Sequence, residues 1–166
     1  PLQAVSVYAA LVNGGKIIKP SLIKVKREEK HSFLVSKKTS RQINDILRKV
    51  VTEKEGTASL ADIHGYYVGG KTGTSQNYKF KNENLNTFVS IFPFQKPRYA
   101  LLVMLENPQI AEDLIYDYRG VKIKGFRNEA GWNSVYVAGK IIEKIGPILA
   151  IKSKDFNNKY VAETIN

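Results

Sequence analysis

The chain has 166 residues, of which 43% are hydrophobic and 25% are charged, and this balance is that of one ordinary globular domain with its own core. It contains no cysteine, which excludes disulfides and thiolate catalysis. The formal net charge is +11, but the 26 basic residues are spread along the chain with acidic residues among them, which favours a solvated basic surface over a nucleic-acid interface. We therefore expect no nucleic-acid partner, and attraction to anionic cell-envelope material stays open.

Two helices are predicted in the first third of the chain. Apolar residues recur at helical spacing over residues 2–12, and Gly14-Gly15 provides a stop. Thr39 and Gln42 match a capping box, so a second helix is predicted to begin near Thr39 and to end at Gly56. The apolar stripe of this second helix consists of Ile43, Ile46, Leu47, Val50 and Val51.

Short strand-like segments are predicted between these helices. Residues 16–19 and 22–25 are separated by Pro20, which favours irregular or edge pairing. Residues 31–35 form a third, weaker segment.

Three stronger strands are predicted over residues 66–75, 86–93 and 98–106. Residues 94–97 form a tight turn, so the second and third of these strands are expected to be antiparallel. Residues 99–105 form an uninterrupted apolar run, and the third strand is therefore expected to be central in the sheet and covered on both faces.

The remainder of the chain is expected to hold an excursion, a helix and a tail. Residues 107–130 are mixed in charge and are interpreted as an excursion or flap, in part with the alternation of a β-arm. A final helix is predicted over residues 132–145, ended by Gly146-Pro147. We expect one domain over residues 1–151, followed by a polar tail over residues 152–166.

The strongest functional signal is the tripeptide Lys71-Thr72-Gly73, which lies in the first of the three stronger strands. Lys-Thr-Gly is one of three catalytic boxes of penicillin-binding proteins and serine β-lactamases, the others being Ser-x-x-Lys and Ser-x-Asn. A strand holds the Lys71 ammonium in place, and Gly73 leaves room for a second backbone to approach. Strand alternation places Thr72 and Thr74 on one side. The tripeptide alone, however, also recurs by chance as a polar strand end.

The sequence around this box resembles the transpeptidase domain of class B penicillin-binding proteins, specifically the septal, FtsI-type D,D-transpeptidases. The segments that carry the resemblance, in order, are residues 1–3, 8–15, 19–20, 47–51, 56–58, 65–74, 88–93 and 97–101. The resemblance covers nearly the whole chain. It implies an α+β fold in which helices cover an antiparallel sheet, as the C-terminal portion of a serine β-lactamase-like transpeptidase fold.

The resemblance also implies a role for each residue of the box. Lys71 would hydrogen-bond the hydroxyl of the second box and support proton transfer. Thr72 and Thr74 would hold the carboxylate of the substrate or antibiotic, and the Thr74 N–H would form half of the oxyanion hole. Gly73 would let a peptide lie alongside the strand. No metal and no organic cofactor is implied.

Two further matches to the boxes lack the required context. Ser21 and Lys24 satisfy Ser-x-x-Lys, but they lie in an extended stretch instead of at the start of a helix. Residues 75–77 satisfy Ser-x-Asn but overlap the Lys-Thr-Gly box. Since the chain opens at Pro1 without an initiator methionine, we expect it to be an excerpt whose nucleophile lies upstream, and inactive by itself.

The implied function is acyl transfer from D-Ala-D-Ala stem peptides of peptidoglycan during cell division, with β-lactam antibiotics as inhibitors. Two alternatives stay open, a β-lactamase or D,D-carboxypeptidase and a non-catalytic penicillin-recognising sensor. The resemblance places the protein at the periplasmic face of the bacterial inner membrane, with an anchor outside this chain and with cell-division proteins as partners. An incomplete sheet edge makes self-association of the excerpt possible.

Overall fold

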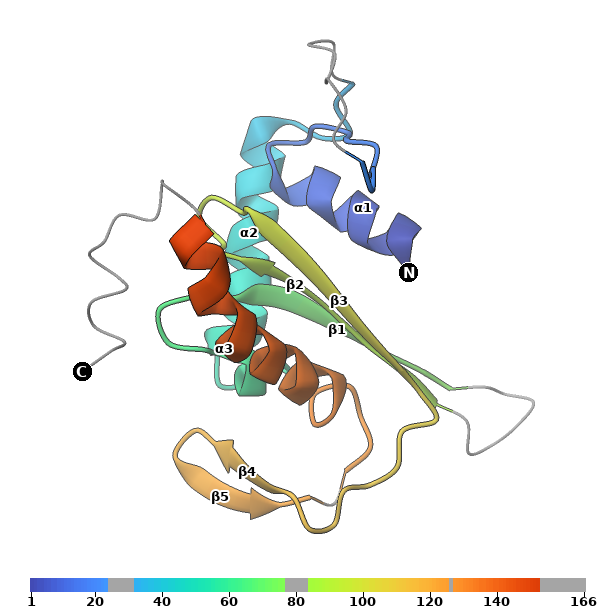
Figure 1. Ribbon diagram of the computed structural model, residues 1–166, viewed down its shortest axis with the longest axis vertical. Helices are drawn as coiled ribbons and strands as arrows, with labels where there is room; N and C mark the ends of the chain where they lie inside the picture. Colours follow the sequence, from blue (N-terminus) through green and yellow to red (C-terminus); the bar gives the residue numbers. More distant parts are fainter. Residues whose placement is uncertain (24–31, 77–83, 126, 153–166) are drawn as a thin grey trace.

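The computed structural model describes residues 1–23, 32–76, 84–125 and 127–152. Its elements in chain order are α1 (Leu2–Val12), α2 (Lys37–Thr52), the 3-10 helix η1 (Ser59–Ala61), β1 (Gly69–Gln76), β2 (Asn84–Phe92), β3 (Tyr99–Glu106), β4 (Ile115–Tyr118), β5 (Val121–Lys124) and α3 (Ser134–Lys152). An antiparallel sheet has the order β1-β2-β3, and β4 and β5 form a separate hairpin. Figure 1 shows α3 across one face of the sheet, with the hairpin below α3. The expected α+β class is confirmed.

The sheet has one face toward α3 and one toward α1. The larger core cluster lies on the α3 face, where Phe88, Phe92 and Val103 pack with Val135, Ala138 and Ile142 of α3. A smaller cluster of Val12, Leu47 and Ile91 joins α1 and α2 to the opposite face. The period-2 alternation of β2 therefore serves both clusters, because Phe88 and Phe92 point one way and Ile91 the other.

Among the described strands, β2 is central and β3 lies at an edge, so in this part of the chain the prediction that residues 98–106 are central and doubly covered is wrong. β2 pairs with β1 on one side and with β3 on the other. Val103 is buried toward α3, but Met104 on the opposite face is 39% exposed. An apolar run shows which residues favour burial, whereas the position of the strand in the sheet determines how far they are buried.

α2 confirms the second predicted helix, but its start differs. Its N-cap is Ser36, whose side chain accepts a hydrogen bond from the backbone N–H of Thr39. Thr39 is thus the capped residue in the first turn instead of the cap. Leu47 and Val51 of the predicted stripe are buried, while Ile46 is 61% exposed because α2 packs along a narrower strip.

α3 continues past the predicted stop at Gly146-Pro147 and ends at Lys152. A Cβ at position 146 would lie 2.2 Å from the ring of Tyr66, so Gly146 is a packing site for that ring. Leu149, beyond the proline, still packs against the core cluster of the α3 face. Tertiary packing therefore carries the helix through a sequence that locally reads as a stop.

Among the described residues between α1 and α2, the predicted weak strands are represented by one bridge, between Lys16 and Phe33. Residues 24–31 lie outside the described part, as do the loop 77–83 and the tail 153–166. The excursion at 107–130 contains the β4–β5 hairpin, in agreement with its expected partial β character.

Two glycines, Gly69 and Gly70, allow β1 to pack closely against α2 and β2. A Cβ at Gly70 would lie 2.5 Å from the ring of Phe88 and 2.6 Å from the carbonyl oxygen of Val89. A Cβ at Gly69 would lie 3.2 Å from the backbone of Leu47 and Arg48 in α2. Both positions must be small because the backbone of β1 itself packs against β2 and α2.

We expect Gly70→Ala to lower the free energy of unfolding by about 3 kcal/mol, because Phe88 is fully buried and cannot move away from the added methyl group. Gly120→Ala is the control. Gly120 has a φ of +79°, and no atom of the described residues lies within 4 Å of a Cβ placed there, so this substitution should cost only about 1 kcal/mol of backbone strain. Urea unfolding of both variants measures the difference. Equal losses would contradict the packing argument.

Candidate functional site

β1 presents the Lys71-Thr72-Gly73 box at one edge of the sheet. Its pairing with β2 places Thr72 opposite Phe88 and Thr74 opposite Asn86. Phe88 faces α3, so the Thr72 and Thr74 side chains also lie on the α3 side. Lys71, opposite Val89, and Gly73 lie toward the other face. The prediction that the two threonines share a side is consistent with this pairing.

Arg48 of α2 makes contacts that hold the start of β1 in place. Its guanidinium donates a 2.6 Å hydrogen bond to the carbonyl oxygen of Val68 and forms a 2.8 Å ion pair with Asp62. It also lies 5.8 Å from the centre of the Phe94 ring. Since the Arg48 side chain is only 19% exposed, these contacts are partly shielded from water. They fix where β1 begins relative to α2.

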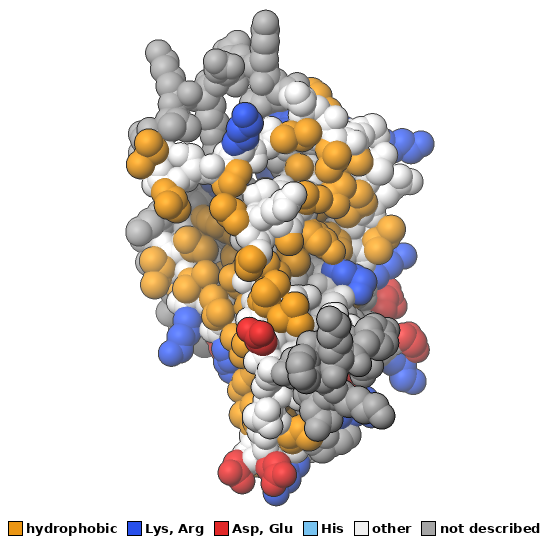
Figure 2. Space-filling model, turned by 90° about the vertical axis from the view of Figure 1, so that its right-hand side faces the viewer, with side chains coloured by type: hydrophobic (Ala, Val, Ile, Leu, Met, Phe, Trp, Pro, Cys, Tyr) orange, Lys and Arg blue, Asp and Glu red, His pale blue; other side chains and the backbone are white. Residues whose placement is uncertain are grey.

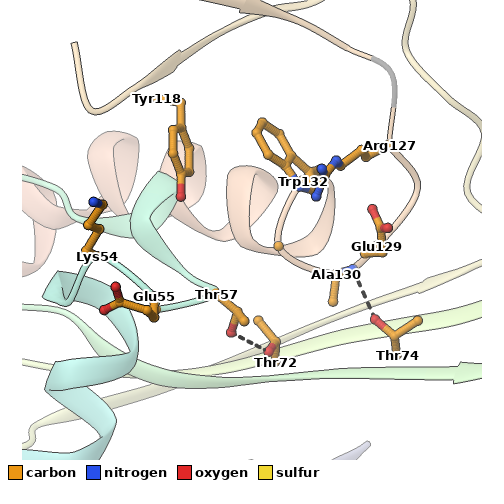
Figure 3. Close-up of a pocket in the computed structure, with 12 residues that line it drawn as sticks. Lys54, Glu55, Thr57, Thr72, Thr74, Tyr118, Arg127, Glu129, Ala130 and Trp132 are labelled. Carbon is orange, nitrogen blue, oxygen red and sulfur yellow. Dashed lines mark hydrogen bonds between the residues drawn. The ribbon is translucent and has the colours of Figure 1, made fainter. Parts of the chain in front are cut away.

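The hydroxyls of Thr72 and Thr74 each have one protein partner (Figure 3). Thr72 Oγ1 lies 2.8 Å from Thr57 Oγ1, and Thr74 Oγ1 accepts a 3.2 Å hydrogen bond from the backbone N–H of Ala130. A hydroxyl that accepts from an N–H keeps its own hydrogen for donation. Thr74 can therefore donate to an acceptor in front of β1.

Both threonines open onto one pocket of about 350 Å³. Its lining residues are Lys54, Glu55, Gly56, Thr57, Thr72, Thr74, Tyr118, Arg127, Glu129, Ala130, Gly131 and Trp132. Figure 3 shows these side chains arriving from three segments, namely the stretch after α2, β1, and the stretch from the hairpin to α3. The pocket offers neutral hydroxyl donors at its floor and charges of both signs at its rim, which suits a small polar group such as a carboxylate.

A network of three asparagine side chains, of which Asn86 is buried, holds residues 128–133 of the pocket wall in position. Asn86 is fully buried in β2 and donates a 2.7 Å hydrogen bond to the carbonyl oxygen of Asn128. Asn133 donates to the side-chain oxygen of Asn128 at 2.9 Å, and Asn128 in turn donates to the carbonyl oxygen of Pro108. The N–H of Ala130 is therefore presented to Thr74 by a segment tied to the central strand.

Lys71 is exposed and lies away from the pocket. Its ammonium donates a 2.6 Å hydrogen bond to the carbonyl oxygen of Thr72. Figure 2 views the side of the molecule that carries α1, where hydrophobic side chains form a broad area. Exposed apolar residues of the described chain that belong to α1 and β3 include Leu2, Val7 and Met104. Lys71 therefore lies on the α1 side of the sheet, whereas Thr72 and Thr74 lie on its α3 side.

Gly73 has a structural reason to be glycine. A Cβ there would lie 2.6 Å from the Thr87 hydroxyl, which donates to the Gly73 carbonyl oxygen at 3.2 Å. Among the described residues, no other atom outside its chain neighbours lies within 4 Å of that Cβ position. The glycine therefore relieves a contact inside the sheet as well as leaving the strand accessible.

Sequence reasoning missed most of the pocket wall. Thr57 follows Gly56, and the turn that brings it to Thr72 gives no local signal. Tyr118, Arg127 and Trp132 were not among the predicted site residues, yet they line the same pocket as Thr72. Gly120 is a local turn signal in this segment, but it does not indicate that the hairpin lies beside Thr72.

The two other box matches remain outside the pocket. Ser21 is exposed, and its hydroxyl forms local bonds to the N–H and carbonyl of Ile23 instead of starting a helix. Ser75 lies in β1, one residue beyond Thr74, and Asn77 is outside the described residues. Within residues 1–23, 32–76, 84–125 and 127–152, no group of three potential metal ligands occurs, and no helix is long and apolar enough to span a membrane.

Comparison with known sequences gives a consistent result. The family described as penicillin binding protein transpeptidase domain matches residues 1–124. The probable peptidoglycan D,D-transpeptidase FtsI of Caulobacter vibrioides is 31% identical over 93% of this chain and 27% of its own length. Stage V sporulation protein D of Bacillus subtilis is 34% identical over 66% of this chain and 19% of its own.

Solved structures resemble the fold in the same way. The transpeptidase domain of the FtsI4 D,D-transpeptidase from Legionella pneumophila gives a TM-score of 0.60 at 27% identity, over 84% of this chain and 43% of that one. A peptidoglycan glycosyltransferase from Burkholderia ambifaria gives a TM-score of 0.59 at 21% identity, over 87% of this chain and 40% of that one, and so supports the fold alone.

We expect Gly73→Ala to lower the free energy of unfolding by about 1 kcal/mol, since the new methyl group must displace the Thr87 hydroxyl. Adding Thr87→Ala removes that hydroxyl, so the double variant should be less destabilised than the sum of the two single variants. Urea unfolding of the four proteins completes the double-mutant cycle. Strict additivity would show that the contact with Thr87 does not constrain position 73.

Proposed function

Because the chain belongs to the transpeptidase domain family of penicillin-binding proteins, we propose that it supplies the Lys-Thr-Gly strand of a peptidoglycan D,D-transpeptidase. The chain spans about a quarter or less of the length of the curated relatives described above, so the activity proposed is that of the whole protein. Its substrates would be stem peptides ending in D-Ala-D-Ala, and β-lactam antibiotics would occupy the same site.

One observation carries this proposal: Thr72 and Thr74, on a strand at the sheet edge, open together onto a single pocket. The Thr74 hydroxyl keeps its hydrogen for a ligand because its oxygen already accepts from Ala130. Two adjacent hydroxyls suit the terminal carboxylate of a peptide or an antibiotic. The edge strand also leaves backbone groups for an added peptide strand.

The acyl transfer divides between this chain and the rest of the protein. A serine outside the chain would attack the penultimate D-Ala carbonyl, and terminal D-Ala would leave with the proton that the serine loses. The Thr74 N–H would serve as one donor to the developing oxyanion, a contribution of about 2.7–4 kcal/mol in comparable sites. Lys71, on the other face of β1, would support proton transfer from there. An amino group of a second stem peptide would then take the acyl group.

We propose that the nucleophile lies outside this chain, because no serine of the chain has both a lysine three residues later and a position at the start of a helix. Ser21 is the only serine followed three residues later by a lysine, and it lies in a local turn. A serine at the start of a helix, with a lysine one turn later, is what the chemistry needs.

The same family assignment supports a proposal for the location and partners of the whole protein. We propose that it works at the periplasmic face of the inner membrane, anchored by a segment outside this chain, alongside other cell-division proteins. The net charge of +11 is compatible with anionic cell-wall polymers nearby.

We expect Lys71→Ala to abolish acylation of the full-length protein by a labelled penicillin while the fold is retained, because the exposed Lys71 makes no core contact. Lys96→Ala, a change at an exposed lysine in the turn between β2 and β3, is the matched control and should be acylated normally. Gel detection of the labelled adduct, with a thermal melt of each variant, gives both readouts. Normal acylation of the Lys71 variant would exclude the proposed role of this box.

We expect the 166-residue chain alone to form no covalent adduct with penicillin, because catalytic groups act as a unit and the nucleophile is missing. Its β3 edge, which has no strand partner among the described residues, is expected to favour self-association. Intact-mass measurement after incubation with a labelled penicillin tests the first expectation, and sedimentation tests the second. A stoichiometric adduct mapped to Ser21 would overturn the placement of the nucleophile.

A further inference from the structure

Arg119 occupies a backbone position that disfavours arginine. It forms, with Gly120, the two-residue loop between β4 and β5, and φ is +54° at Arg119 and +79° at Gly120. Positive φ at both loop residues defines a type I′ turn, for which asparagine followed by glycine is the preferred pair. A long side chain with positive φ is strained, so the side chain of Arg119 needs a reason to be there.

That reason is visible at the end of α2. The Arg119 guanidinium donates to the carbonyl oxygen of Thr52 at 3.4 Å and also to that of Glu53. Thr52 is the last residue of α2 and Glu53 is its C-cap. Carbonyls at a helix C-terminus lack helical partners and carry partial negative charge, so they favour a cation.

The same guanidinium begins a stack that leads into the pocket. It lies 5.8 Å from the Tyr118 ring centre, and Tyr118 stacks on Trp132 with centroids 5.2 Å apart and planes inclined by 25°. On the Trp132 ring lies Arg127, at 5.7 Å. The order is therefore cation, ring, ring, cation, and Tyr118, Trp132 and Arg127 all line the pocket.

The stack is supported from behind by one buried ring. Tyr116 is 4% exposed and meets Trp132 edge-on at 5.5 Å and Tyr136 of α3 edge-on at 5.1 Å. Burial, and then the neighbouring Tyr136, raise the pKa of Tyr116, so it stays an uncharged packing group. The hairpin is thus held at its base by aromatic packing and at its tip by Arg119.

We propose that Arg119 is a positioning residue that latches the β4–β5 hairpin to the end of α2 and so fixes the Tyr118–Trp132 wall of the ligand pocket. Arg119 itself does not line the pocket, so it acts through Tyr118 and Trp132. Trp132 is two residues from Ala130, whose N–H orients the Thr74 hydroxyl. Loss of the latch should therefore weaken non-covalent binding of a carboxylate ligand and leave the later chemical step largely unchanged. The ligand part of this inference rests on the proposed function.

Arg119→Asn in the full-length protein is the decisive variant, because asparagine suits the turn and removes only the latch. Arg119→Lys, which keeps the charge and a donor, is the rescue variant. We expect the dissociation constant of the initial penicillin complex to rise about tenfold in Arg119→Asn, as for loss of a charged hydrogen bond, with the limiting acylation rate nearly unchanged. Arg119→Lys should recover part of the affinity.

The position of the wall can be read without any acylation. The protein is labelled with 5-fluorotryptophan, and the fluorine resonance of residue 132 is assigned as the one lost in Trp132→Phe. We expect this resonance to shift in Arg119→Asn and to return toward its original position in Arg119→Lys. An unmoved resonance in Arg119→Asn would overturn the latch. If the resonance shifts in Arg119→Asn but the protein with the native sequence is not acylated by penicillin, the positioning role of Arg119 is supported and the proposed function is contradicted.

Discussion

The close approach of β1 to the ring of Phe88 is the constraint on which the rest of the structure depends. Phe88 is fully buried at the centre of the sheet, and it packs on α3 while the bare backbone of Gly70 lies against its ring. Gly69 brings the same strand against α2. Gly69 and Gly70 thus determine how closely β1 packs against α2 and β2. This packing positions Thr72 and Thr74, the next residues of β1 on the α3 side, within hydrogen-bond distance of Thr57 and Ala130.

Local patterns in the sequence located the helices α1, α2 and α3 and the strands β1 to β3, but not which elements lie beside one another. The stripe of α2 depends on residues close in sequence, and its members Leu47 and Val51 are buried as predicted, while Ile46 is exposed. The antiparallel pairing of β2 and β3 across the turn at residues 94–97 is likewise a local feature that the sequence predicted. β3 was expected at the centre of the sheet because residues 99–105 are an apolar run. This expectation failed because an apolar run does not show which strands lie on either side of it. Gly146 was taken as a stop because the ring that packs on it, Tyr66, is distant in sequence.

The same division applies to the site. The common side of Thr72 and Thr74 follows from strand alternation, which is a local rule. The partners of their hydroxyls, Thr57 and Ala130, depend on how loops pass over the sheet, and no periodicity encodes that. The family match ends at residue 124, so the wall segment at 127–132 also lies beyond the recognised sequence pattern.

The hydrogen bonds of the pocket imply an order of assembly. Thr74 is bonded to a residue 56 positions later, and Asn86 to one 42 positions later, so both bonds close long loops. Closing such loops costs chain entropy, so we expect contacts of this separation to form after local helices and hairpins. During folding, the strand that carries Lys71 can therefore pair with β2 before the pocket wall is in place. Until residues 127–132 reach β1, the free edge of this strand is open to other chains.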